Sequence, residues 1–217
     1  MKVKICCISS IEEAKLAINL GATALGLVGP MPSGPGIISN EEIANIAAQI
    51  PSFVDTFLLT SETKAEHIIA HHRMVSTTTI QLVDALENRQ YEIIKQALPA
   101  TKIVRVLHVL NETTIQEAIE IAPQVDALLL DSGNPNLKIK TLGGTGKTHD
   151  WQISRKIVEA VDLPVYLAGG LNAQNVAQAI QKVRPDGVDL CSGVRTDEKL
   201  DEAKLRQFIN AVKNATS

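Results

Sequence analysis

Cysteine is scarce in this chain, and the long apolar runs of membrane proteins are missing. Only three of the 217 residues are cysteines, and an odd number argues against a disulfide framework. The longest apolar runs, such as residues 125–130, are far shorter than the roughly 20 residues that span a bilayer. The opening MKVKICC is typical of a β-strand, not of the charged head and apolar stretch of a signal peptide. We therefore expect a cytoplasmic protein with reduced thiols and no membrane partner.

The chain also lacks an excess of positive charge. Its formal net charge is −3, and lysine and arginine are scattered among the acidic residues. This pattern provides neither a basic stripe for nucleic acid nor a polybasic patch for a membrane surface. Hydrophobic residues make up 45% of the sequence, and no segment is of low complexity, so the chain can bury a sizeable core.

Short apolar runs rich in β-forming residues recur along the whole chain, and each is followed by a helical pattern. The expected strands are residues 3–7, 24–28, 53–59, 78–83, 103–109, 126–131, 164–168 and 187–191. The expected helices are residues 11–21, 40–50, 65–72, 88–98, 114–122, 150–161, 172–183 and 201–212. Such alternation predicts an α/β protein with a parallel sheet.

Eight βα units fit a closed (β/α)8 or TIM barrel, which would occupy residues 1–217 as one domain. The alternative is an open, doubly wound sheet. That fold usually has fewer strands and would favour a G-x-G-x-x-G turn after the first strand, where this chain has CCISSIE. We therefore expect the barrel.

A barrel binds its ligands at the carboxyl ends of the strands. Gly169 and Gly170 follow the seventh expected strand, and Ser192 and Gly193 follow the eighth. These small residues leave backbone N–H groups accessible ahead of a helix, which favours a phosphate site. The alternative is that the glycines only form tight turns.

The loop after the sixth expected strand is long and contains GGTGK. The spacing of this motif does not match a P-loop. We interpret the segment as a glycine-rich lid in which Lys147 could meet an anionic ligand, or otherwise remain a surface lysine.

Asp131 ends the sixth expected strand directly after the apolar ALLL. Partial desolvation would raise its pKa and suit it to act as a general acid, although a capping role is the alternative. A thiol at the end of the first strand would face it across the barrel mouth. A cysteine and an aspartate around a sugar phosphate would make an acid–base pair.

We expect no metal site. Cys6 and Cys7 are adjacent, so strand alternation would send their side chains to opposite faces, with Cys7 packed as a small hydrophobic residue. Cys191 is the only other cysteine, and the five histidines show no ligand spacing.

Together these motifs resemble the phosphoribosylanthranilate isomerase family over essentially the whole length. The matching stretches are KIC at 4–6, QL at 81–82, LLLDS at 128–132, GGTGKTHDW at 143–151, LAGGLNAQNV at 167–176 and RPDGVDLCSGVR at 184–195. The resemblance implies an Amadori rearrangement of a phosphoribosylated anthranilate in tryptophan biosynthesis, without a cofactor. It makes Cys6 the general base and Asp131 the general acid. It also implies substrate or phosphate contacts at Gln81, Gly144, Lys147, Gly169, Gly170, Asp189, Ser192 and Gly193.

Three stretches depart from the family pattern. Cys7 replaces the glycine of K-I-C-G, Gly36 stands at the arginine of S-P-R, and Val83 and Asp84 replace the histidine and glycine of Q-L-H-G. Loss of the arginine and the histidine affects the anthranilate side of the site. Two alternatives therefore stay open: a related barrel that takes another phosphorylated sugar derivative, and a non-catalytic barrel that binds a sugar phosphate. In each case we expect a monomer or homodimer.

Overall fold

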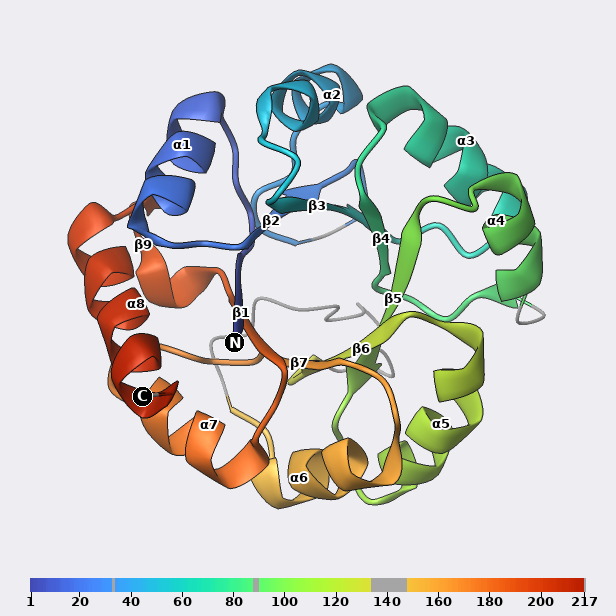
Figure 1. The fold of residues 1–217 in the computed structure, drawn as a ribbon. Helices are drawn as coiled ribbons and strands as arrows, with labels where there is room; N and C mark the ends of the chain where they lie inside the picture. Colours follow the sequence, from blue (N-terminus) through green and yellow to red (C-terminus); the bar gives the residue numbers. More distant parts are fainter. Residues whose placement is uncertain (33, 88–89, 134–147, 217) are drawn as a thin grey trace.

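The computed structural model describes residues 1–32, 34–87, 90–133 and 148–216. Within these residues, parallel strands close into a barrel in chain order (Figure 1). The strands are β1 Lys2–Ile5, β2 Ala24–Val28, β3 Asp55–Thr60, β4 Thr79–Leu82, β5 Lys102–His108, β6 Ala127–Asp131, β7 Val165–Leu167 and β8 Gly187–Leu190. Because β1 also pairs with β8, the ring is closed. The predicted TIM barrel is confirmed, and the open sheet is excluded.

Helices form an outer ring around the strands (Figure 1). They are α1 Ile11–Leu20, α2 Asn40–Gln49, α3 Ala65–Val75, α4 Tyr91–Ala97, α5 Thr113–Ile121, α6 Trp151–Ala160, α7 Val176–Val183 and α8 Glu202–Thr216. Shorter elements are the 3₁₀ turns η2 Ala122–Gln124 and η3 Ser192–Val194, and the small hairpin of β9 Arg195–Thr196 and β10 Lys199–Leu200. None of the described helices has the length and apolar character needed to cross a membrane.

Polar caps fix where several helices begin. The Ser10 hydroxyl accepts a hydrogen bond from the Glu13 N–H at the start of α1, and Ser39 caps α2 in the same way. The expected start of α7 at residue 172 was wrong by four residues. Asn172 instead accepts hydrogen bonds from the N–H groups of Gln174 and Asn175, which closes a local turn ahead of the helix.

Two apolar layers result from side-chain alternation along the strands. The larger layer lies between strands and helices and includes Leu25, Leu58 and Leu130. The smaller layer fills the barrel, where the Phe57 and Tyr166 rings meet edge to face with centroids 5.9 Å apart. The barrel interior is therefore packed, and its open end is the place for a site.

Two phenylalanines allow the packing of the outer layer to be tested. The side chain of Phe208 on α8 is 0% exposed, whereas that of Phe53 is 75% exposed. We expect Phe208→Ala to lower the free energy of unfolding by about 3–5 kcal/mol, since the cavity cannot be refilled. Phe53→Ala should change it by less than about 0.5 kcal/mol. Urea titration of both variants measures the difference, and equal effects would contradict the packing described.

Candidate active site

A buried ion pair lies at the seam where the barrel closes. Lys4 of β1 is 0% exposed, and its Nζ lies 3.0 Å from Oδ1 of Asp189 on β8. The two residues are also register partners across the seam. Burial alone would lower the pKa of Lys4, but the charges of Asp189 and of the nearby Cys6 raise it above its ordinary value. The ammonium therefore stays protonated inside the barrel.

Gly26 of β2 makes room for Cys6 beside this ammonium. A Cβ atom at Gly26 would lie 2.8 Å from the Cys6 Sγ and 3.0 Å from the Lys4 Nζ. The Cys6 Sγ and the Lys4 Nζ therefore both lie where a side chain at position 26 would begin. This brings the sulfur predicted to be the base close to a fixed positive charge.

Asp131 ends β6 at the same mouth of the barrel and is only 8% exposed. The Ser132 N–H donates a hydrogen bond to its Oδ1 at 2.7 Å. Burial raises the pKa of Asp131 to about 6, and the negative charge of Asp189 acts in the same direction. The desolvation expected from the sequence is present.

The loops after β7 and β8 interlock through glycine. Gly169 and Gly170 have φ angles of +82° and +62°, which favour glycine. A Cβ at Gly193 would lie 2.2 Å from the Leu171 carbonyl oxygen, so the two loops approach too closely for any side chain there. The first N–H groups of η3, which begins at Ser192, have no acceptor within the turn. The loops thus bring together four of the residues predicted to bind phosphate.

Cys7 corrects one expectation from the sequence. We expected it to face away from Cys6, but β1 ends at Ile5, and Cys7 adopts a left-handed conformation with φ +62°. Both cysteines consequently belong to the smaller apolar layer that fills the barrel, the interior cluster. Hydrogen bonds shared with the thiols of Cys191 and Cys6, together with burial, raise the pKa of Cys7 above its ordinary value.

An arginine clamp holds this bend in the chain. Arg195 Nη2 donates to the Cys7 carbonyl oxygen and forms an ion pair with Glu13 Oε2 at 2.9 Å. The clamp thus ties α1, the end of β1 and the strand after η3 together.

Gly36 lies against Cys7. It has φ +71°, and a Cβ there would lie 2.5 Å from the Cys7 Cβ. A larger residue at position 36 and a side chain at position 7 therefore compete for the same space. Val83, at the other departure from the family pattern, is part of the interior cluster.

The remaining predicted residues fall into two groups. Gln81 is buried on β4, and its Oε1 has no hydrogen-bond partner among the described residues. Gly144 and Lys147 lie outside the described residues. The sequence indicated Lys4 only as part of the KIC motif and not as a functional residue. Its position two residues before Cys6, which places both side chains on one face, was the available signal.

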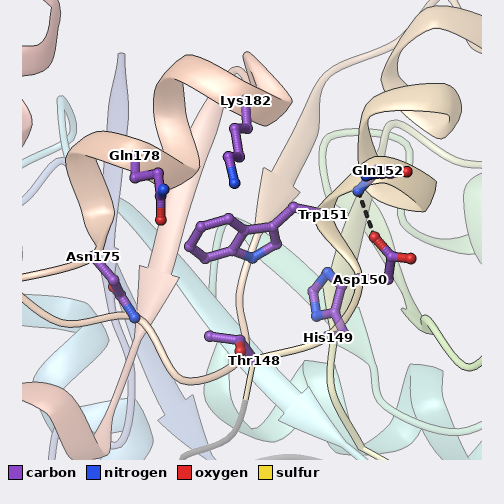
Figure 2. A pocket seen from close by; sticks show the side chains of 8 residues that line it. All are labelled: Thr148, His149, Asp150, Trp151, Gln152, Asn175, Gln178 and Lys182. Carbon is purple, nitrogen blue, oxygen red and sulfur yellow. Dashed lines mark hydrogen bonds between the residues drawn. The ribbon is translucent and has the colours of Figure 1, made fainter.

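A separate pocket of about 420 Å³ lies between the beginning of α6 and α7, and Figure 2 shows Trp151 at its centre. Lys182 Nζ lies 5.9 Å from the centroid of the Trp151 ring. Neither Cys6 nor Asp131 lines this pocket, so it is distinct from the barrel mouth.

Comparison with known proteins identifies the family. A family model for N-(5′-phosphoribosyl)anthranilate (PRA) isomerase matches residues 3–211. The chain belongs to this family. It is 32% identical over 213 residues to the N-(5′-phosphoribosyl)anthranilate isomerase of Methanocella arvoryzae, with 98% of each chain covered. The protein is therefore a phosphoribosylanthranilate isomerase-type enzyme.

Solved structures of the family share the fold over the full length. The phosphoribosyl anthranilate isomerase of Thermotoga maritima has a TM-score of 0.83 at 30% identity, with 99% of both chains covered. A crystal structure of the enzyme in complex with reduced 1-(o-carboxyphenylamino)-1-deoxyribulose 5-phosphate has a TM-score of 0.80 at 27% identity, again with 99% of both chains covered. Against the family pattern, two of the departures in this chain, Cys7 and Gly36, touch each other.

This contact predicts that the two positions are energetically coupled. Gly36→Ala should lower the free energy of unfolding by about 2 kcal/mol or more, because a Cβ meets both a left-handed backbone and Cys7. In a Cys7→Gly background the same change should cost less by about 0.5–3 kcal/mol. A double-mutant cycle from urea titrations measures this coupling.

Gly34→Ala is the matched control, because its φ is also positive but a Cβ there would meet only Met31 Sδ at 3.7 Å. Its effect should be independent of Cys7. Additive effects for positions 7 and 36 would refute the proposed coupling.

Proposed function

We propose that this enzyme converts N-(5′-phosphoribosyl)anthranilate into its 1-deoxyribulose isomer, with Cys6 as general base and Asp131 as general acid. The observation that carries the proposal is the pair of opposed environments at one mouth of the barrel. Cys6 lies beside the Lys4 ammonium, whereas Asp131 is buried with a pKa raised to about 6. The first places a fixed positive charge beside the proposed base, and the second favours a protonated carboxyl.

Asp131 acts first in this scheme. Its proton passes to the ring oxygen of the ribose as the C1′–O bond breaks, and the nitrogen lone pair forms a C=N bond. Deprotonation at C2′ by the Cys6 thiolate then supplies the electrons of a C1′–C2′ double bond and returns the nitrogen to neutrality. Transfer of the enol proton from O2′ to C1′ gives the ketone. The proton on Cys6 returns to Asp131 through solvent, so the reaction is a net isomerisation.

Lys4 supports the proton abstraction by Cys6 without itself exchanging a proton, although its charge lowers the pKa of Asp131. Its fixed ammonium stabilises negative charge on Cys6, and its ion pair with Asp189 holds it in place. In this scheme Asp189 acts through Lys4 and through its effect on the pKa of Asp131.

The phosphate of the substrate would occupy the interlocked loops after β7 and β8. N–H groups around Gly169, Gly170, Ser192 and Gly193 would donate to its oxygens. Gly144 and Lys147 remain proposed contacts from the family resemblance.

All the groups in this scheme come from one chain. We propose that residues 1–217 act as one domain, whether as a monomer or as a homodimer. A thiolate base requires a reducing compartment, which is consistent with the cytosol.

Removing either reacting group should affect turnover far more than folding. We expect Cys6→Ser and Asp131→Asn each to lower kcat by about 10²–10⁴-fold in a fluorescence assay of the anthranilate substrate. Exposed Asp162→Asn is the control and should leave kcat unchanged. Turnover within a few-fold of the wild type for either active-site variant would refute the assignment.

The pKa of Asp131 predicts the alkaline side of the pH profile. A general acid must be protonated, and this carboxyl loses its proton as the pH rises through about 6. The kcat/KM value should therefore fall at higher pH by about tenfold per pH unit, until another process becomes limiting. Asp131→Asn has no proton to lose there, so its profile should lack this limb. If kcat/KM of Asp131→Asn still falls with the same midpoint, the fall is caused by the titration of a different group.

A further inference from the structure

His108 is a buried imidazole at the barrel mouth that the scheme above does not use. It is the last residue of β5 and the register partner of Asp131 on β6. Both residues are 8% exposed. Neither ring nitrogen of His108 makes a well-formed hydrogen bond within the described residues, although the Val83 carbonyl lies close enough to affect its pKa. Buried polar atoms without partners are rare in native proteins and require an explanation.

The surroundings keep this imidazole neutral. Burial and the positive charge of Arg105 lower the pKa of His108 to about 4, against smaller effects of the Val83 carbonyl and of Asp84. Arg105 itself donates to the Leu82 carbonyl oxygen at 3.2 Å. A neutral imidazole offers one N–H donor and one acceptor nitrogen.

The side chain of His108 is directed into the barrel. Val104 and Val106, at alternate positions of the same strand, both belong to the interior cluster. Alternation places His108 on the same face, one step nearer the mouth. It is therefore on the substrate side of β5, next to the proposed general acid.

The order of the strands indicates which part of the substrate His108 would meet. The phosphate loops follow β7 and β8, Asp131 ends β6, and His108 ends β5. In the proposed orientation, with the phosphate in those loops and the ribose ring oxygen at Asp131, the amino-linked aromatic acid would extend toward β5. The strongest hydrogen-bond acceptor in that part of the molecule is the carboxylate.

We propose that His108 donates a ring N–H to the carboxylate of the aromatic acid and so determines specificity at that end of the site. The proposal rests on the proposed function, because it uses the orientation of that substrate. It also accounts for a carboxylate contact in a chain where Gly36 lies against Cys7 and has no side chain to offer.

The test compares two ligands that differ only in the carboxylate. They are reduced 1-(o-carboxyphenylamino)-1-deoxyribulose 5-phosphate and the same compound with a plain phenylamino group. Their dissociation constants are measured by calorimetry for the wild type, His108→Leu and His108→Asn. Turnover of N-(5′-phosphoribosyl)anthranilate is measured separately.

We expect His108→Leu to weaken binding of the carboxylated ligand by about 10–100-fold, the usual effect of losing a hydrogen bond to a charged group. Binding of the plain phenylamino ligand should stay within about threefold, because it makes no such contact. His108→Asn retains an N–H donor and should restore part of the lost affinity.

Stability provides a second readout. An unpartnered buried imidazole destabilises the free protein, so His108→Leu should raise the melting temperature by roughly 2–4 °C. A purely structural histidine would give a lower melting temperature instead, and that result would overturn the proposal.

Equal effects of His108→Leu on both ligands, or no effect on either, would also overturn it, as would a wild type that binds the two ligands equally. A wild type that discriminates between the ligands through His108 but does not turn over the substrate would refute the proposed function and leave the carboxylate contact standing.

Discussion

The buried ion pair between Lys4 and Asp189 is the constraint on which the site depends. It joins β1 to β8, where the first and last strands of the barrel meet. Removing two charges from water is costly, so a pair of this kind is retained in a core only with close geometry and contributes little net stability. Its consequence here is electrostatic. The ammonium lies beside the Cys6 sulfur, while the carboxylate helps to raise the pKa of Asp131. The pair therefore places a positive charge beside Cys6, while at Asp131 the raising effect of its carboxylate on the pKa outweighs the lowering effect of its ammonium.

Packing explains why two departures from the family pattern occur together. Cys7 adopts a left-handed backbone that normally favours glycine, and its Cβ occupies the space beside Gly36. Arg195 and Glu13 hold the bend from outside. A thiol at position 7 is compatible with this loop only if position 36 has no side chain. Positions 7 and 36 thus share one packing constraint in this chain.

Much of this architecture follows from local sequence patterns. Buried parallel strands read as apolar runs, so the eight strands were found with small errors at their ends. The desolvation of Asp131 followed from the apolar ALLL that precedes it. The face of Cys7 could not be predicted, because alternation applies only while a strand continues, and β1 ends two residues earlier. The partnership of Lys4 with Asp189 joins residues from opposite ends of the chain, so no local pattern contains it. His108 looked like an isolated histidine until the register placed it beside Asp131.

The neutral state of His108 matters for its neighbour. A protonated imidazole next to Asp131 would stabilise the carboxylate and lower the pKa of that group. Asp131 would then lose its proton well below neutral pH and could not act as an acid there. Burial and the charge of Arg105 prevent this by holding the pKa of His108 near 4. A neutral donor can therefore contact a substrate carboxylate without discharging the general acid beside it, whereas an arginine at the same position could not. Of the charges that act on Asp131, the raising effect of Asp189 is larger than the lowering effect of Lys4, so the carboxyl keeps its raised pKa.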